Sequence, residues 1–205
     1  MRANATMLAT LVAITCAQGA AAQQTPTDDL CGAIAAGDVD EVRDLLNHGV
    51  DPNARDSIGE TSLTCAIKQV GILGDANASG QLRAMQFLLE HGAKVDGPDA
   101  KGETPLGVAA GNGGNRDQSD GQIAAVRLLL EKGANVNSAN NPQKITPLHW
   151  ASYRGYTASI RLLLDHGADR SVRNTYGETP LDMMAQNPVL DLDKAKEVKA
   201  LLAEH

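Results

Sequence analysis

Apolar residues recur along this chain at helical spacing, in short stretches separated by polar residues. Ile160, Leu163 and Leu164 show the pattern, since residues three and four apart lie on one face of a helix. A glycine follows each of four such stretches: Gly49, Gly92, Gly133 and Gly167. Glycine readily adopts the left-handed conformation that ends many helices. The pattern therefore predicts amphipathic helices, each of which buries one apolar face against a neighbour.

A second motif, Thr-x-Leu, occurs four times and marks where another helix begins. Its copies start 12, 12, 13 and 12 residues after the preceding glycine, at Thr61, Thr104, Thr146 and Thr179. Thr is a good N-cap residue, and Pro, which follows it in three copies, suits the first helical position. The near-constant spacing predicts stacked helix pairs, in which no pair buries its apolar face alone.

The best copy of this pattern is ITPLHWASYRGYTASIRLLLDHGADRSVRNTYG, residues 145–177. It contains TPLHWA at 146–151, which fits the signature of a 33-residue ankyrin repeat. The segments HGAKVDGPDAKGETPLGVAA and KGANVNSANNPQKITPLHWA are further copies. The chain thus resembles the ankyrin repeat family from residue 28 to its C-terminus. The resemblance implies an all-α fold, an ankyrin-repeat solenoid of stacked helix pairs with β-turn fingers.

The first 27 residues differ from the rest, because Arg2 is their only charged residue. The uncharged run MLATLVAITCA (7–17), followed by small residues up to Ala22, is typical of a secretory signal peptide. We therefore expect a signal peptide at 1–22, cleaved near Ala22, and export to a bacterial periplasm. A retained anchor, a buried N-terminal helix and lipidation at Cys16 are the alternatives that this segment leaves open.

After a short N-terminal linker at 23–27, the ankyrin repeat domain is expected to occupy 28–205. Its first unit is an N-terminal cap without the Thr-Pro start, and its last unit is a cap that ends in a charged helix. Polar outer faces on the end units keep a solenoid soluble. The five expected units are 28–56, 57–99, 100–140, 141–174 and 175–205.

In the second and third units the distance from the motif leucine to the glycine that ends the second helix is 29 and 27 residues, ten and eight more than the 19 residues of the fourth unit. The additional residues lie within 71–81 and 111–122, which are rich in Gly, Asn, Asp and Ser and are expected to be loops. Insertions in adjacent repeats map to one edge of the stack, so these loops should lie side by side, opposite the fingers. They are either a binding edge or tolerated loop growth, because lengthening a loop costs little free energy.

Composition and motifs argue against several classes of function. The chain has 25 acidic and 18 basic residues, a net charge of −7, whereas nucleic-acid-binding proteins are usually basic. No run of 18 apolar residues occurs, so no membrane insertion is expected. The sequence shows no nucleophile motif, phosphate loop or metal-ligand spacing. We expect no enzyme activity, no cofactor and no metal, and we expect a monomer that binds a protein partner.

The histidines are expected to support the scaffold. His48, His91 and His166 each stand just before a glycine at a helix C-terminus, where a histidine can meet the last carbonyl groups. His149 is the histidine of the repeat signature, and the resemblance implies that it hydrogen-bonds the backbone of a turn.

In the ankyrin family, finger tips and inner helices form a concave binding face. Carried over by position, the resemblance implies that partner-binding residues are Ile58, Lys101, Glu103, Tyr153, Arg154 and Tyr176. Tyr and Arg are over-represented among binding hot spots. Four of the five aromatic residues lie between positions 150 and 176. Of these four, Trp150 and Tyr156 are expected to fill the stack.

Two cysteines, Cys31 and Cys65, follow the expected leader. They stand one and two residues after Leu30 and Leu63, which places them in the inner helices of neighbouring units. Equivalent positions in packed helices are about 10 Å apart, whereas a disulfide needs Cα atoms within about 4.4–6.8 Å. An exported protein meets an oxidising compartment. The pair is therefore either a disulfide or two small buried apolar side chains.

These observations favour a non-catalytic protein-binding module in the periplasm, holding its partner on the concave face or on the insertion edge. Two narrower roles compete: an immunity-type inhibitor of a toxic enzyme, and an accessory factor in stress defence. An enzyme that uses the insertion loops is the alternative from another class. A purely structural spacer is a third.

Overall fold

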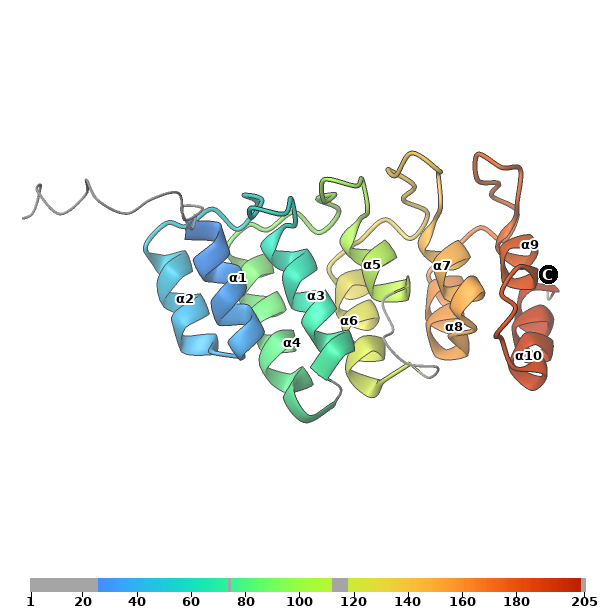
Figure 1. Ribbon diagram of the computed structural model, residues 1–205, viewed down its shortest axis with the longest axis horizontal. Helices are drawn as coiled ribbons and strands as arrows, with labels where there is room; N and C mark the ends of the chain where they lie inside the picture. Colours follow the sequence, from blue (N-terminus) through green and yellow to red (C-terminus); the bar gives the residue numbers. More distant parts are fainter. Residues whose placement is uncertain (1–25, 74, 112–117, 204–205) are drawn as a thin grey trace, which may run out of the picture.

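The computed structural model describes residues 26–73, 75–111 and 118–203, which form a row of stacked helix pairs (Figure 1). Within these residues, inner and outer helices make two layers, and the fingers extend from one edge of the row, uppermost in Figure 1. In the same residues the β-pairing is confined to one isolated bridge between Arg55 and Thr61. The predicted all-α solenoid of helix pairs is confirmed.

Ten helices alternate between the two layers of the described chain. The inner helices are α1 (Pro26–Ala36), α3 (Ser62–Leu73), α5 (Pro105–Gly111), α7 (Pro147–Arg154) and α9 (Pro180–Ala185). The outer helices are α2 (Val39–Asn47), α4 (Asp75–Glu90), α6 (Asp120–Glu131), α8 (Thr157–Asp165) and α10 (Leu192–Ala203). None of these described helices is both long and apolar enough to cross a membrane.

The signal peptide expected at 1–22, with Cys16 and the cleavage site, lies outside the described residues. So do residues 23–25 of the expected linker and residues 112–117 of the second insertion.

The core lies between the two layers and is continuous along the row. The motif leucines Leu30, Leu63, Leu106 and Leu148 are at most 1% exposed. Ile160 and Leu163 of α8 are fully buried, as the helical spacing predicted. The alanines three residues after these leucines, such as Ala151, are also buried and let adjacent inner helices pack closely.

The inner helices begin at the predicted caps. Thr146 Oγ1 accepts a hydrogen bond from the His149 backbone N–H, with Pro147 in the first helical turn. Thr179 and Asp182 form the same reciprocal capping arrangement in α9. Such caps satisfy backbone N–H groups that have no partner inside the helix.

The first helix corrects two expectations. α1 begins at Pro26, so residues 26 and 27 of the expected linker (23–27) are helical, and Thr27 is buried. Pro26 opens α1 as a proline opens α5, α7 and α9, with Thr25 before it in the sequence, so the first unit has the proline start that it was expected to lack. The signal was missed because this pair stands further ahead of Leu30 than the other Thr-Pro pairs stand ahead of their leucines.

The first insertion is not a loop, which corrects the expectation for 71–81. α3 continues to Leu73 and α4 begins at Asp75, so the additional residues mostly lengthen two helices. α4 has 16 residues, whereas α8 of the fourth unit has 9. Gln81 is buried, and a Cβ at Gly80 would lie 3.5 Å from the Gly37 carbonyl oxygen. Packing against the first unit thus outweighs the weak helix propensity of this segment.

The described end of the second insertion is also partly helical. Ser119 caps α6 by accepting a hydrogen bond from the Gln122 N–H, and the Gln122 side chain accepts one from the Ser119 N–H. Residues 120–122, expected to belong to a loop, form the first turn of α6.

Each finger is a tight turn organised by one Asp or Asn side chain. Asp56 Oδ1 accepts hydrogen bonds from the backbone N–H groups of Ile58 (3.0 Å) and Glu60 (2.8 Å). The equivalent residues, five positions before each later motif threonine, are Asp99, Asn141 and Asn174. Short Asx side chains stabilise turns in this way. Neighbouring fingers also bond each other, since Ala100 N–H donates to the Gly59 carbonyl at 2.9 Å.

The third finger has a lysine where the other three have glycine. Lys144 has a φ of 53°, and Gly59, Gly102 and Gly177 at the equivalent positions have φ of 85°, 78° and 79°. A side chain in this left-handed region costs about 1–3 kcal/mol. The longer Gly-to-Thr spacing of this unit arises before Asn141, so the finger itself keeps the register of the others.

Candidate functional site

The face formed by the inner helices and the fingers contains a shallow hollow of about 210 Å³, which we call the Trp150 hollow. It lies where the finger at 99–103 meets α5 and α7. Five charged side chains line it, Lys68, Asp99, Lys101, Glu103 and Arg154, together with the indole of Trp150, Val108 and two glycines of α5. Charged groups of both signs thus surround one half-buried indole ring.

Two glycines of α5 make room for the indole. A Cβ at Gly111 would lie 3.0 Å from Trp150 Cβ and 3.1 Å from Cγ, and one at Gly107 would lie 4.0 Å from Cδ1. Larger residues at Gly111 would therefore displace the ring. The indole N–H is itself shielded from solvent and has no hydrogen-bond partner among the described residues. Because the nitrogen is shielded, a partner can contact only the exposed part of the ring and not this N–H.

Glu103 is the carboxylate that interacts with the indole of Trp150. Burial raises the pKa of Glu103, and the negative charge of Asp99 raises it further. The indole of Trp150, followed by Lys101 and Lys68, acts in the opposite direction by favouring the charged carboxylate. The Trp150–Glu103 contact nevertheless falls outside hydrogen-bond geometry. The hollow thus places a half-buried carboxylate beside the indole ring.

The structure brings together three of the six residues proposed for partner binding. Lys101, Glu103 and Arg154 line the Trp150 hollow. Ile58 and Tyr176 lie at finger tips outside it, 73% and 71% exposed. These fractions are unusual for large apolar side chains.

Tyr153 also lies outside the hollow and is half-buried near the C-terminal unit. Its backbone carbonyl accepts a hydrogen bond from Asn187 Nδ2 at 2.6 Å. Tyr156 is 3% exposed and fills the stack as expected.

The sequence predicted only part of the surroundings of Trp150. It packs on α5 as expected of a stack residue, but it also lines the hollow. A signal was available, because it occupies the variable position of the repeat signature, TPLHWA. Val108, at the same position one unit earlier, lines the hollow as well.

His149 links two units through both of its ring nitrogens. Its side chain is fully buried. The Thr146 backbone N–H donates to Nδ1 (3.2 Å), so Nε2 carries the proton and donates to the Glu178 carbonyl of the next finger (3.0 Å). Burial lowers the pKa of His149 below its ordinary value of 6.5. The neutral ring therefore serves as a structural hydrogen-bonding bridge.

The other three predicted scaffold histidines cap helix ends. The Nδ1 atoms of His48, His91 and His166 lie 2.7–2.8 Å from the backbone carbonyl oxygens four residues earlier. These contacts bind carbonyl groups that lack a partner at a helix C-terminus.

Comparison with known proteins agrees with this arrangement. The family model described as "Ankyrin repeats (3 copies)" matches residues 30–140 and 118–205. The chain belongs to the ankyrin repeat family. Ankyrin repeats mediate protein–protein binding, and the family is generally non-catalytic.

Several curated ankyrin-related proteins are similar to this chain over short stretches. Ankyrin repeat and SOCS box protein 11 of Danio rerio is 47% identical over 47 residues, which are 23% of this chain and 16% of that protein. Palmitoyltransferase ZDHHC13 of Mus musculus is 48% identical over 42 residues, 20% of this chain and 7% of that protein. Palmitoyltransferase ZDHHC17 of Danio rerio is 38% identical over 68 residues, which are 31% of this chain and 11% of that protein. The matches span at most 16% of these relatives.

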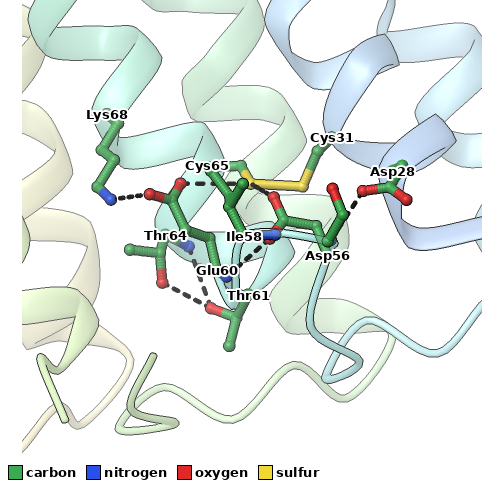
Figure 2. The surroundings of a disulfide bond; sticks show 10 residues. Asp28, Cys31, Asp56, Ile58, Glu60, Thr61, Thr64, Cys65 and Lys68 are labelled. Carbon is green, nitrogen blue, oxygen red and sulfur yellow. Dashed lines mark hydrogen bonds and ion pairs between the residues drawn. A yellow bond between two sulfur atoms is a disulfide. The ribbon is translucent and has the colours of Figure 1, made fainter. Parts of the chain in front are cut away.

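The ankyrin units at the N-terminal end are joined covalently. A disulfide links Cys31 of α1 to Cys65 of α3, and the two Cα atoms are 6.0 Å apart (Figure 2). This distance lies within the usual range for a disulfide. Equivalent inner-helix positions would be too far apart, and the one-residue offset between the cysteines brings them closer.

Carboxylates surround this disulfide. Asp56 Oδ2 lies 3.7 Å from Cys65 Sγ, and Glu60 Oε2 lies 3.9 Å from it. Glu60 is paired through its other oxygen with Lys68. Asp28 of α1 accepts a hydrogen bond from the Ser57 N–H at 2.9 Å and so ties the first finger to the first helix. Figure 2 shows these groups on the finger side of the disulfide.

Proposed function

We propose that this chain is an exported, non-catalytic ankyrin module that acts in a bacterial periplasm and holds one partner protein on its finger and inner-helix face. The Trp150 hollow is the centre of that interface. The observation that carries this proposal is the Trp150 hollow itself, where a half-buried indole ring lies among the exposed cations Lys101 and Arg154. Trp and Arg are the residue types in which interface energy concentrates.

The chemistry of the hollow indicates what the partner presents. Lys101 and Arg154 are exposed, and no ion pair to either is recorded among the described residues. Both are charged donors that suit a carboxylate. Carboxylates bound by charged donors make stronger hydrogen bonds than neutral acceptors do. We infer that the partner inserts an Asp or Glu side chain between Arg154 and Trp150.

The exposed aromatic and apolar tips extend this interface. Ile58 and Tyr176 stand on fingers at opposite ends of the face and are more than 70% exposed. A partner that covers the row would bury both of them. Interface energy concentrates in a few Trp, Tyr and Arg residues, surrounded by contacts that exclude water.

Binding is tested with partner captured from a periplasmic extract on the immobilised chain. Trp150→Ala and Arg154→Ala should each weaken binding of the purified partner by about 30-fold or more, the range of hot-spot residues. Arg161→Ala on the outer helix α8 is the matched control and should bind normally. Circular dichroism confirms that each variant is folded. Unchanged binding by both hollow variants contradicts the proposed interface.

The proposed location has its own test. Mass spectrometry of the protein recovered from cells should find Gln23, or a close neighbour, at the N-terminus. An intact Met1 in the cytosolic fraction would contradict export without bearing on the interface.

The identity of the captured partner separates the two narrower roles. An immunity-type inhibitor would bring down a toxic secreted enzyme, and an accessory factor in stress defence would bring down a resident periplasmic enzyme. The alternative of an enzyme built on insertion loops loses support from the helical structure of 75–81.

A further inference from the structure

Three potential metal ligands meet beside the first two ankyrin units. The Sγ atoms of Cys31 and Cys65 and a carboxylate oxygen of Asp56 all lie within 4.8 Å of one another. They come from α1, from α3 and from the first finger, so the folded stack brings together groups that are far apart in the sequence. Figure 2 shows the Asp56 carboxylate beside the two sulfur atoms.

We propose that the reduced protein binds one Zn²⁺ ion through Cys31, Cys65 and Asp56, with water as the fourth ligand. The disulfide and the metal site are alternative states of the same residues. A disulfide occupies both sulfur atoms, so zinc binds only after reduction.

The spacing of these donors fits a tetrahedral zinc ion. With Zn–S of about 2.3 Å and Zn–O of about 2.0–2.2 Å, neighbouring S and O ligands are roughly 3.6 Å apart and two S ligands roughly 3.8 Å apart. Asp56 Oδ2 already lies 3.7 Å from Cys65 Sγ. The Cα atoms of the cysteines are 6.0 Å apart, so rotation of the side chains alone can separate the sulfurs to that distance.

Asp56 is oriented in advance for this role. Its Oδ1 is held by the N–H groups of Ile58 and Glu60, which leaves Oδ2 facing the sulfur atoms. Hydrogen bonds that fix a ligand in this way strengthen metal binding. The nearby Lys68 is paired with the Glu60 carboxylate, so its positive charge is already compensated and does not oppose the charge of the zinc ion.

The chemistry balances with an external reductant. A phosphine or a dithiol donates two electrons to the disulfide, the S–S bond breaks, and two protons complete the thiols. Zinc then displaces both protons as the thiolates coordinate it, so affinity should rise with pH. Thiolate ligands favour Zn²⁺ over Mg²⁺ and Ca²⁺, which prefer oxygen.

The experiment uses the full chain carrying Cys16→Ser, so that only the two proposed ligand cysteines report. After reduction with a phosphine and removal of the reagent under nitrogen, the protein is titrated with Co²⁺ and then with Zn²⁺. We expect thiolate-to-Co²⁺ charge-transfer absorption that saturates at one ion per chain and is displaced by Zn²⁺. The oxidised protein should show none.

Two matched variants test the carboxylate ligand. Asp56→Asn keeps the Oδ1 acceptor that organises the finger and removes the charged ligand, and should weaken Zn²⁺ binding by roughly 10-fold or more. Asp99→Asn makes the same change in the next finger, where no cysteine is near, and should bind Zn²⁺ normally.

Two results overturn the proposal. One is a reduced protein that binds no more Co²⁺ than the Cys31→Ser/Cys65→Ser variant. The other is equal affinity of the two Asn variants, which would assign binding to the thiols alone. Circular dichroism of every reduced sample confirms that the stack remains folded.

Discussion

The seam between α1 and α3 and the seam between α7 and α9 join equivalent inner helices by different chemistry. The first is closed by a covalent bond between Cys31 and Cys65. The second is bridged by His149, which bonds the start of its own helix and the Glu178 carbonyl of the next finger. Thr64 stands at the His149 position in the second unit, where its hydroxyl and its backbone N–H both hydrogen-bond with Thr61 Oγ1 of the same unit. The fold fixes where the inner helices lie, and the interaction that joins neighbouring helices differs from one unit to the next.

This difference has an energetic meaning. A disulfide acts largely by restricting the unfolded chain, whereas the His149 bridge stabilises the folded state by satisfying buried polar groups. The N-terminal seam should therefore respond to redox conditions and the C-terminal seam to pH. The predictions below separate these two responses.

Opening the N-terminal seam should have the largest effect. Cys31 and Cys65 are 34 residues apart, for which chain entropy predicts a loss of about 3–4 kcal/mol in the free energy of unfolding when the disulfide is absent. Urea denaturation of Cys31→Ser/Cys65→Ser measures it, with Cys16→Ser as control. Thiol titration of the unreduced, denatured chain in the Cys16→Ser background should find no free thiol. Two thiols per chain, together with an unchanged unfolding free energy, would remove the contrast between the seams.

Removing the C-terminal bridge should have the second largest effect. His149→Ala leaves the Glu178 carbonyl and the Thr146 N–H without their partner and opens a cavity, which should cost about 2–4 kcal/mol. His48→Ala is the control, because His48 is exposed and contacts one carbonyl at a helix end. Its loss should be at most about 1 kcal/mol. Similar losses for the two variants in urea denaturation would contradict the bridging role.

The pH dependence of stability tests the same bridge without removing it. The folded-state pKa of His149 is lowered by burial, so the unfolded chain binds the proton more readily. The stabilisation is complete above the ordinary pKa of 6.5 and is lost as pH falls from there through the lowered folded value. Urea denaturation across this range should give a smaller loss in His149→Thr, which places in the fourth unit the residue that the second unit already has. Equal losses would exclude His149 as the source.

The smallest predicted effect concerns the third finger, which lies next to the His149 seam. Lys144→Gly should raise the free energy of unfolding by about 0.5–1 kcal/mol, because relief of the left-handed strain exceeds the entropic cost of a glycine. Lys132→Gly is the control, since Lys132 is the C-cap residue of α6 and has a φ of −86°, so a glycine relieves no strain there. A loss of stability in both variants would show that Lys144 is not strained.

The sequence predicted the features that repeat and missed those that depend on a neighbouring unit. The threonine caps and the buried motif leucines follow from residues within one repeat, and the hydrogen bond of His149 to a turn is implied by the resemblance to the ankyrin family. The exposure of Trp150 depends instead on Gly107 and Gly111, which belong to the preceding unit and shape the floor of the hollow. Spacing within one repeat carries no information about such a contact.

The two insertions show the same limit. Gly, Asn and Ser favour loops locally, yet 75–81 is helical because Ala78 and Gln81 are buried. The cysteine pair is similar: their offset was visible in the sequence, but the distance it produces depends on how two helices are rotated against each other. The Asx residues of the fingers could have been found, since each stands five positions before a motif threonine.

The disulfide between α1 and α3 also makes the two ends of the row unequal in their resistance to opening. In a stack where each unit touches only its neighbours, opening proceeds most easily from the ends. One end is fastened by a covalent bond, whereas at the other α10 is held without one, by its buried Val198, Leu201 and Leu202 and by the exposed ion pair of Arg161 and Glu197. Amide hydrogen exchange should therefore be fastest in α9 and α10 and become slower toward α1 and α3, because unfolding begins at the C-terminal end.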